Sequence, residues 1–377
     1  MTNKFFDEIK GNFGFGCMRL PMKNGKVDHE QFCKMVDEFI AQGFNYFDTA
    51  HVYLGGQSET AIREAISKRY PRESFILTNK LSTHCFNKQE QIRPLLDEQL
   101  EACGVDYFDF YLMHAQDGNI FEKFKRCKAY ETALELKAEG KIKHFGISFH
   151  DKAEVLERIL TEYPQVEIVQ IQFNYVDYED ASVESRKVYE VCEKFGKPVL
   201  VMEPVKGGSL VNLPDEAKKV FDDLNAERGR KLSYASYALR FAASFKNMCV
   251  VLSGMSDMEQ MQDNLSFMAD FTPLDEGEMA AVNEVCRIFR SMDMIPCTAC
   301  RYCTDGCPKK ILIPDLFSCY NAKTAFHNWN QDYYYNNILT RVNGKASDCI
   351  GCKQCERICP QHLPITKLLG EVAREFE

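Results

Sequence analysis

Short apolar runs alternate with amphipathic stretches over most of the chain. One amphipathic stretch begins at Asp28 and ends at Gly43, and its apolar residues recur at helical spacing: Phe32, Val36, Phe39 and Ile40. Strand-sized apolar runs cover residues 45–48, 75–80, 107–114, 144–148, 167–172, 198–202 and 248–254. Helical patterns follow at residues 88–103, 121–139, 151–162, 182–195 and 257–269. This alternation predicts an α/β fold of repeated strand–helix units.

Seven strands with intervening helices fit a (β/α)8 barrel, the TIM barrel. An eighth strand is needed to close it, and we expect that strand between residues 210 and 245. An open doubly wound sheet would show the same alternation. Such a sheet usually has a glycine-rich turn after its first strand, and none follows FDTA (47–50). The barrel is therefore the preferred fold.

The pattern changes after residue 270. A last helix is predicted at 275–290, and from Pro296 onward cysteine and proline punctuate short helices and loops. We therefore expect two domains, a barrel over residues 1–290 and a small, mainly helical domain over residues 291–377.

Charge and hydropathy exclude several classes of partner. The 377 residues carry a formal net charge of −9, which disfavours binding to nucleic acid or to an anionic membrane. Apolar runs such as VLVM (199–202) are far shorter than the roughly 20 residues of a membrane helix. The N-terminal segment has no apolar run of signal-peptide length. We expect a cytoplasmic protein whose partners are neither nucleic acid nor membrane.

Seventeen cysteines are many for a cytoplasmic chain, in which disulfides are rare. Nine occur singly and are interpreted as small reduced core or surface residues. They are Cys17, Cys33, Cys85, Cys103, Cys127, Cys192, Cys249, Cys286 and Cys319. The other eight form two tight groups near the C-terminus, which indicates metal binding.

Both groups have the spacing C-x2-C-x2-C-x3-C-P. The first group contains Cys297, Cys300, Cys303 and Cys307. The second group contains Cys349, Cys352, Cys355 and Cys359. Structural zinc would need only four ligands and favours paired CxxC units. The repeated run is instead that of bacterial ferredoxins.

The resemblance to two-cluster ferredoxins implies two 4Fe–4S clusters. In those proteins the fourth cysteine of each run binds the cluster of the other run. Carried over, one cluster would be held by Cys297, Cys300, Cys303 and Cys359. The other would be held by Cys307, Cys349, Cys352 and Cys355.

The insert between the two groups is about forty residues long and is predicted to be helical over 313–323 and 328–339. It resembles the helical ferredoxin-like module attached to several multidomain oxidoreductases. Its aromatic residues are interpreted as core rather than as an electron path: Trp329, Tyr333, Tyr334 and Tyr335.

Polar residues end three successive predicted strands, namely Asp48, Lys80 and His114. In a barrel the carboxyl ends of all strands open on one face, where catalysis takes place. Tyr53 lies five residues after Asp48, in the loop above that face. The four side chains suggest carbonyl reduction, because hydride transfer builds negative charge on oxygen and needs a positioned acid.

Each of the four residues has a role in such a reaction. Tyr53 would supply the proton, and the Lys80 ammonium would favour the phenolate and ease loss of the proton. Asp48 would hold Lys80 in place and keep it charged. His114 would orient the carbonyl oxygen, since it can donate a hydrogen bond in either neutral tautomer.

The segments FDTAHVY (47–53), ILTNKL (76–81) and FYLMH (110–114) resemble those that carry the catalytic tetrad of aldo-keto reductases. This resemblance implies an oxidoreductase with Tyr53 as acid/base. It extends over residues 12–270. Further similar segments are the opening hairpin GFGCMRLP (14–21), LKAEGKIKHFGIS (136–148), VQIQFN (169–174), MEPVKGGSL (202–210) and LSGMSDMEQMQDN (252–264).

The same resemblance implies NAD(P)H as cofactor. Ser148 and Gln170 would bind its carboxamide, and Asn264 would lie near its adenine end. Met202, where many members have a stacking aromatic residue, and Gly254 complete the predicted cofactor contacts. Residues 254–260 contain no Lys or Arg for a 2′-phosphate, so charge favours NADH over NADPH.

Three hypotheses for function follow. The first is an NAD(P)-dependent reductase of a small aldehyde or ketone, fused to a 4Fe–4S electron-transfer module. Its clusters either exchange electrons with a redox partner protein or serve mainly structure or sensing. The alternative is an electron-transfer or redox-sensing protein that binds nucleotide without significant carbonyl turnover. A third gives the ferredoxin-like module a purely structural role. The presence of all four tetrad residues favours the reductase.

Overall fold

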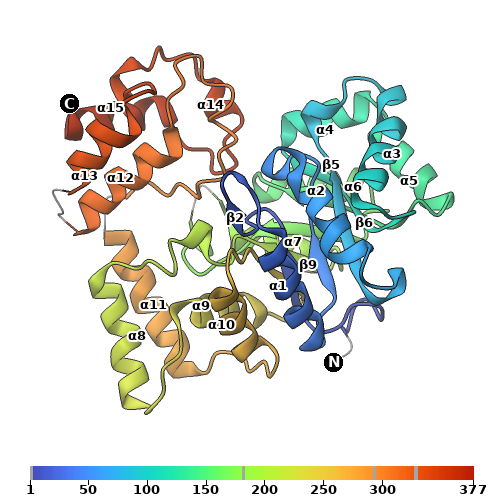
Figure 1. Cartoon of the computed structure of the whole chain (residues 1–377), viewed down its shortest axis with the longest axis horizontal. Helices are drawn as coiled ribbons and strands as arrows, with labels where there is room; N and C mark the ends of the chain where they lie inside the picture. The colour runs from blue at the N-terminus through green and yellow to red at the C-terminus, as the bar shows by residue number, and fades with distance from the viewer. Residues whose placement is uncertain (1–2, 181–182, 292–293, 327–329) are drawn as a thin grey trace. The chain divides into compact units, whose positions relative to one another are not determined.

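The computed structural model describes residues 3–180, 183–291, 294–326 and 330–377 (Figure 1). The chain divides into two compact units. The first unit comprises Met1–Glu179, Glu184–Pro204 and Ala235–Leu274. The second unit comprises Asp180–Val183, Val205–Tyr234 and Asp275–Glu377. Among the described helices, none combines the length and apolar character needed to span a bilayer.

The first unit contains a closed barrel of eight parallel strands, which confirms the predicted fold class. The strands are β1 (Phe13–Gly16), β4 (Tyr46–Asp48), β5 (Ile76–Leu81), β6 (Phe108–Gln116), β7 (Ile142–Phe149), β8 (Ile168–Gln172), β9 (Val199–Met202) and β10 (Met248–Ser253). They follow one another round the barrel in this order, and β10 pairs with β1. Because all pairs are parallel, the carboxyl ends of the strands open on one face.

The eighth strand is not where the sequence predicted it. Residues 210–245 form the helices α8 (Asp215–Glu227) and α9 (Tyr234–Ala243). The strand that completes the barrel is β1, which the sequence indicated only as part of an opening hairpin. A separate short hairpin follows β1, made of β2 (Met22–Lys23) and β3 (Lys26–Val27).

Strand β1 was missed because its sequence, FGFG, is half glycine, and glycine is a poor strand former. The structure gives the reason for the glycine at position 14. A Cβ there would lie 2.7 Å from a side-chain carbon of Leu252 on β10 and 3.1 Å from Tyr46 on β4. Gly14 therefore makes room for large side chains from both neighbouring strands.

Amphipathic helices accompany the strands of the first unit, and Figure 1 shows them outside the sheet. They are α1 (His29–Ala41), α2 (Gln57–Ile62), α3 (Ile92–Cys103), α4 (Gly118–Arg126), α5 (Ala129–Ala138), α6 (Ala153–Glu162), α7 (Ser185–Lys194), α9 and α10 (Met258–Met268). The helix predicted at 121–139 is in fact two helices. Lys128, with φ of 52°, breaks the helical path between α4 and α5.

The second unit is mainly helical. Its helices are α8, α11 (Glu276–Ser291), α12 (Ile313–Phe326), α13 (Asn330–Tyr333), α14 (Gln354–Arg357) and α15 (Ile365–Phe376). Of the predicted aromatic core, Trp329 lies outside the described residues. Tyr335 is buried and stacks on Phe376 with ring centroids 4.5 Å apart, as a core residue does.

The repeat of the two cysteine runs is also a repeat of the backbone. In each run the residues on either side of the second cysteine, and the third residue after the fourth cysteine, have positive φ. They are Ala299, Arg301 and Lys310 in the first run, and Gly351, Lys353 and His362 in the second. Helices α12 and α15 each begin six residues after the fourth cysteine of their run.

Candidate active site

The predicted catalytic residues lie at the carboxyl ends of neighbouring strands. Asp48 is the last residue of β4, Lys80 lies one residue before the end of β5, and His114 lies near the end of β6. Tyr53 reaches the same region through a tight turn, in which its N–H donates to the Ala50 carbonyl at 3.0 Å. The three residues after Tyr53 all have positive φ, and two of them are glycines, which tolerate that conformation.

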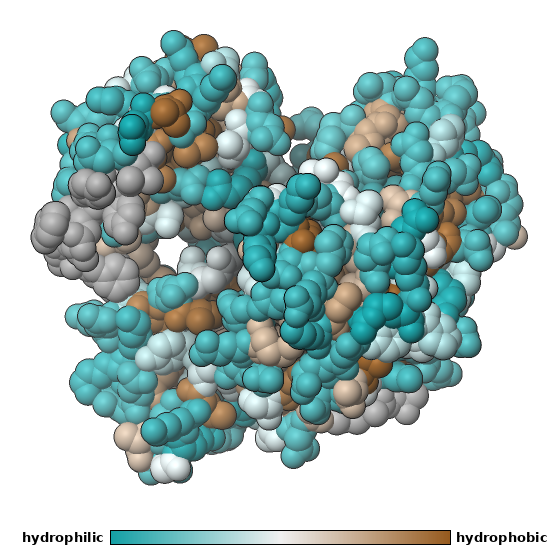
Figure 2. Space-filling model, viewed as in Figure 1, coloured by the Kyte–Doolittle hydropathy of each residue, from teal (hydrophilic) through white to brown (hydrophobic). Residues whose placement is uncertain are grey.

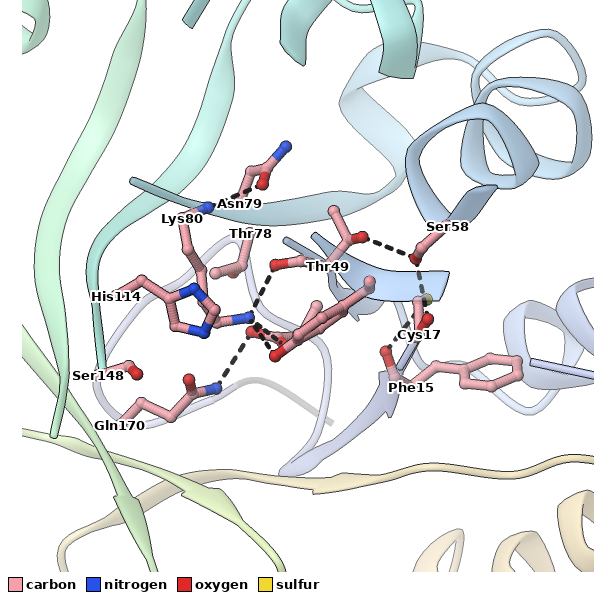
Figure 3. A network of polar contacts seen from close by, with 12 residues as sticks. Phe15, Cys17, Thr49, Ser58, Thr78, Asn79, Lys80, His114, Ser148 and Gln170 are labelled. Carbon is pink, nitrogen blue, oxygen red and sulfur yellow. Dashed lines mark hydrogen bonds and ion pairs between the residues drawn. The ribbon is translucent and has the colours of Figure 1, made fainter. Parts of the chain in front are cut away.

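The Lys80 ammonium is the centre of the site (Figure 3). Its Nζ lies 2.6 Å from Asp48 Oδ1, 2.7 Å from the Thr49 carbonyl oxygen and 3.2 Å from the Tyr53 hydroxyl oxygen. Asp48 also accepts a hydrogen bond from Gln170 Nε2 at 3.1 Å. The site therefore brings together residues from β4, β5 and β8 and the loop after β4.

Asp48 and Lys80 form a fully buried ion pair. Burial raises the pKa of Asp48 and lowers the pKa of Lys80, because it disfavours the charged form of each. Their mutual hydrogen bond opposes both shifts. Each charge is thus retained inside the barrel only because the other is present.

The pKa of Tyr53 is raised well above its usual value of 10, first by burial and then by the carboxylates of Asp48 and Glu203. In the resting site these causes outweigh the expected effect of the Lys80 ammonium, because Asp48, 2.6 Å from the ammonium, offsets much of its positive field at the phenol oxygen. Tyr53 is held protonated, which is the form that a proton donor requires.

His114 lies beside Tyr53, with their ring centroids 6.1 Å apart. Burial lowers the pKa of His114 well below 6.5, and the charge of Lys80 lowers it further, so the ring is neutral. Its Nδ1 lies 2.6 Å from Ser82 Oγ, a residue that the sequence did not single out. Because Nδ1 is engaged by Ser82, an N–H for a carbonyl would come from Nε2, in the tautomer in which Ser82 donates to Nδ1.

The predicted carboxamide-binding residues lie side by side. Ser148 on β7 is paired in register with Gln170 on β8. Ser148 Oγ accepts the Ala115 N–H at 3.0 Å, and Gln170 donates from Nε2 to Asp48. The Ser148 O–H and the Gln170 Oε1 complement the oxygen and the NH2 of a carboxamide. The residues present therefore fit a nicotinamide.

The other predicted cofactor residues lie at the ends of β9 and β10. Met202 ends β9, and Gly254 follows β10. Asn264 on α10 is buried, and its Nδ2 donates to Ser253 Oγ at 2.8 Å. This bond ties α10 to the end of β10.

Sequence reasoning missed an ion pair at this edge of the site. Arg19, from the loop after β1, lies 3.7 Å from Glu203 and beside Gly254. Both charges are near enough to influence the pKa of Tyr53, which Arg19 lowers and Glu203 raises. The segment around Gly254, which has no basic residue of its own, thus receives a positive charge from elsewhere in the sequence.

In the second unit the eight clustered cysteines line two cavities. The first cavity is lined by Cys297, Cys300, Cys303 and Cys359. The second cavity is lined by Cys307, Cys349, Cys352 and Cys355. Each cavity thus takes three cysteines from one run and the fourth from the other, which is the crossed arrangement that the ferredoxin resemblance implied.

The donor set fits an iron–sulfur cluster better than a single metal ion. Among the described residues, no group of three or more His, Cys, Asp or Glu side chains is close enough to hold one ion. Thiolates around a cube are spread over its corners, because each binds a different iron. Burial raises the pKa of Cys303, and the neighbouring thiols of Cys300 and Cys297 raise it further, so a bound cation would be needed to hold this thiolate.

The family model for the aldo/keto reductases matches residues 12–287. The chain belongs to the aldo/keto reductase family. A model for a 4Fe–4S dicluster domain matches residues 296–363, so this aldo/keto reductase carries an iron–sulfur domain at its C-terminal end. The two matches correspond to the barrel and to the two cysteine runs.

Relatives of this aldo/keto reductase cover mainly the barrel. An uncharacterized oxidoreductase, YqkF, of Bacillus subtilis is 26% identical over 298 residues, which is 71% of this chain and 90% of the relative. An NADH-specific methylglyoxal reductase of Escherichia coli is 26% identical over 286 residues, which is 65% of this chain and 85% of the relative.

Solved structures of aldo-keto reductases share the fold. A thermostable aldo-keto reductase bound to epalrestat superposes with a TM-score of 0.59 at 22% identity, over 72% of this chain and 94% of that one. An aldo-keto reductase of Bacillus halodurans in its holo form has a TM-score of 0.59 at 24% identity, over 76% of this chain and 95% of that one.

Proposed function

We propose that this aldo/keto reductase reduces an aldehyde or ketone with NADH, with Tyr53 as acid/base. The observation that carries the proposal is the position of the Lys80 Nζ, within hydrogen-bond distance of both Asp48 Oδ1 and the Tyr53 hydroxyl. This links the proton donor to a charge pair that is fully inside the barrel.

When bound, a reduced nicotinamide supplies hydride to the carbonyl carbon. Tyr53 donates its proton to the oxygen on which charge develops. The phenolate that remains is stabilised by the Lys80 ammonium at 3.2 Å, in a site where charges are weakly screened. His114 donates from Nε2 to the same carbonyl oxygen and so orients it.

The cofactor contacts extend this proposal. Ser148 and Gln170 hold the carboxamide, Met202 and Gly254 border the nucleotide, and Asn264 positions the end of β10 near the adenosine. Two features favour NADH over NADPH. The segment 254–260 has no basic side chain of its own, and Arg19 beside Gly254 is paired with Glu203. A relative with 26% identity is named as an NADH-specific reductase of methylglyoxal.

The second part of the proposal concerns the dicluster domain, with a domain boundary near residue 290. We assign Cys297, Cys300, Cys303 and Cys359 to one cluster, and the other four clustered cysteines to the second, because these sets line separate cavities. Each cluster transfers one electron at a time, whereas a nicotinamide transfers two as hydride. The clusters therefore serve a separate one-electron partner rather than the carbonyl directly.

The test is an anaerobic assay of the full-length protein with both clusters reconstituted. NADH and NADPH oxidation are compared on a panel of small carbonyls that includes methylglyoxal. Tyr53→Phe should lower kcat by roughly 10²- to 10⁴-fold, the usual contribution of a positioned acid, while the dissociation constant for NADH stays within about twofold. The matched control is Tyr107→Phe, which removes a phenol just before β6, at the opposite end of that strand from His114.

Nucleotide binding with a carbonyl rate that Tyr53→Phe leaves unchanged would refute the reductase. It would favour an electron-transfer or redox-sensing protein that uses the barrel for nucleotide binding. Iron and sulfide content and the absorbance of the clusters, measured on every sample, show separately whether the cluster assignment holds.

A further inference from the structure

The two cysteine cavities of the second unit differ in their exposure. Apart from cysteines, the first cavity is lined by residues such as Thr298, Phe317 and Gln361, which are all buried. The second cavity is lined partly by exposed residues, among them Lys309, Ile350 and Lys353, and partly by the buried residues Ile311, Ile313 and Leu369. Within the second unit, the second cavity therefore lies nearer the solvent.

The charged side chains that line the second cavity are both positive, and the exposed carboxylates of Asp305 and Asp348 each adjoin a lining residue in the sequence. Lys309 and Lys353 line it directly. Lys310 precedes the lining residue Ile311, and Lys345 follows Gly344, which pairs with Ile311 and donates its N–H to the Lys310 carbonyl at 3.3 Å. Among the described side chains, no carboxylate pairs with Lys309, and the Lys353 ammonium lies 3.9 Å from its nearest one. These four lysines are exposed in a chain whose net charge is −9.

Apolar side chains are exposed in the same part of the chain. Ile350, between two cysteines of the second cavity, is 61% exposed, and Val342 is 82% exposed. Ile358, directly after α14, is 46% exposed. Figure 2 shows hydrophobic patches among hydrophilic side chains on the unit that carries α12 to α15. Of these three residues, Ile350 lines the second cavity, so its exposed side chain is placed to contact a molecule that docks beside that cavity.

We propose that this surface, the cluster rim (Lys309, Lys310, Lys345, Ile350 and Lys353), docks a small acidic one-electron carrier protein. The proposal rests on the assignment of a 4Fe–4S cluster to the second cavity. The carrier loses one electron and the cluster gains it, with no bond or proton transferred. Electrons therefore enter the second unit at the cluster rim.

The charge pattern selects an acidic protein over other polyanions. Four lysines around an exposed isoleucine resemble a protein interface, in which an apolar centre is enclosed by a charged rim. A nucleic acid would gain nothing from the isoleucine, and the net charge of −9 would repel a long polyanion. An acidic carrier presents its charge on one small face and can bury the apolar side chains.

The test uses the full-length protein with both clusters and a purified acidic flavodoxin as probe. The dissociation constant is measured by calorimetry at low and high salt. The electron-transfer rate from flavodoxin hydroquinone to the oxidised cluster is followed by stopped-flow absorbance. Lys309→Glu/Lys353→Glu should weaken binding and slow association roughly tenfold at low salt. The difference should largely disappear near 1 M salt, where the Debye length is about 3 Å.

The matched control is Lys34→Glu/Lys68→Glu. It makes the same charge change at two exposed lysines of the first unit, whose side chains are 64% and 54% exposed. Ile350→Asn tests the apolar contact, and it should weaken binding about fivefold at every salt concentration, because its contribution is hydrophobic. Iron content, sulfide content and cluster absorbance must match the unmodified protein in each variant.

Three results would overturn the docking proposal. One is that the cluster-rim variant and the control variant bind flavodoxin with equal dissociation constants. Another is unchanged binding of a flavodoxin whose surface carboxylates have been amidated. The third is tighter binding of a DNA duplex or of anionic vesicles than of flavodoxin. A reconstituted chain without iron at the second cavity would instead refute the cluster assignment, and with it the docking.

Discussion

Replacement of Lys80 by Met tests the buried charge pair of the active site. Lys80 is fully buried, and methionine has a similar length and no charge. The substitution leaves the Asp48 carboxylate inside the barrel with Gln170 as its remaining side-chain hydrogen-bond donor. Burial already raises the pKa of Asp48, and removal of the ammonium raises it further.

The size of the effect depends on pH. Removing one partner of a buried ion pair costs about 3–5 kcal/mol. Protonation of Asp48 sets an upper limit on this loss of stability. At pH 7 the protonation of a carboxyl with an unfolded-state pKa of about 3.9 costs only about 4 kcal/mol. At pH 5.5 that limit falls to about 2 kcal/mol. In the variant the folded chain binds a proton that the unfolded chain lacks, so its stability relative to the unmodified protein rises as the pH falls.

The assay is urea unfolding of the anaerobic protein at both pH values, followed by far-UV circular dichroism. Cluster absorbance is recorded in parallel to separate unfolding of the second unit from that of the barrel. The control is Asp48→Asn/Lys80→Met, which has no ionisable group at either position and should lose the pH dependence. Equal destabilisation by Lys80→Met at pH 7 and pH 5.5 would refute the reasoning, since Asp48 would then not be a buried charge.

Three further predictions concern residues of the barrel unit. Ser82→Ala removes the donor to Nδ1 of His114 and should lower kcat by about tenfold, as expected for one lost hydrogen bond, with little change in NADH affinity. Gly14→Ala should destabilise the barrel by about 1–3 kcal/mol in urea unfolding through overpacking. The bond from His51 to Glu59 raises the pKa of His51, so NMR titration should show a raised value that Glu59→Gln abolishes. The His51–Glu59 pair should make its full contribution to the free energy of unfolding below a pH of about 6.5. That contribution should be lost as the pH rises through the raised pKa of His51.

The strand–helix alternation was enough to predict the barrel, because each strand is an apolar run and each helix has one apolar face. It failed at a short strand that is rich in glycine. β1 has four residues, two of them glycine, and only the side chains of β10 and β4 around Gly14 explain why glycine is required there. The helix predicted at 121–139 failed for a similar reason, since the left-handed Lys128 depends on how α4 and α5 pack.

The sequence predicted the positions of the candidate site residues better than it predicted the charges and hydrogen bonds around them. Strand position alone was sufficient to place Asp48, Lys80 and His114 at one mouth, because parallel strands end on the same face. The partner of His114, Ser82, could have been noticed as the polar residue directly after β5. Glu203 and Arg19 could not, since their pairing joins loops after β9 and β1 that are distant in sequence.

The sequence by itself determined the cysteine chemistry, because the spacing of each run dictates which thiols one tight loop can present to a cluster. It also determined the order of the candidate catalytic residues along the strands. Only the tertiary structure decided the protonation of these groups and the solvent exposure of each cysteine cavity. A pKa depends on burial and on charges from every element that packs around a group. Exposure depends on which side chains from distant segments cover a surface, and neither property can be read from local sequence.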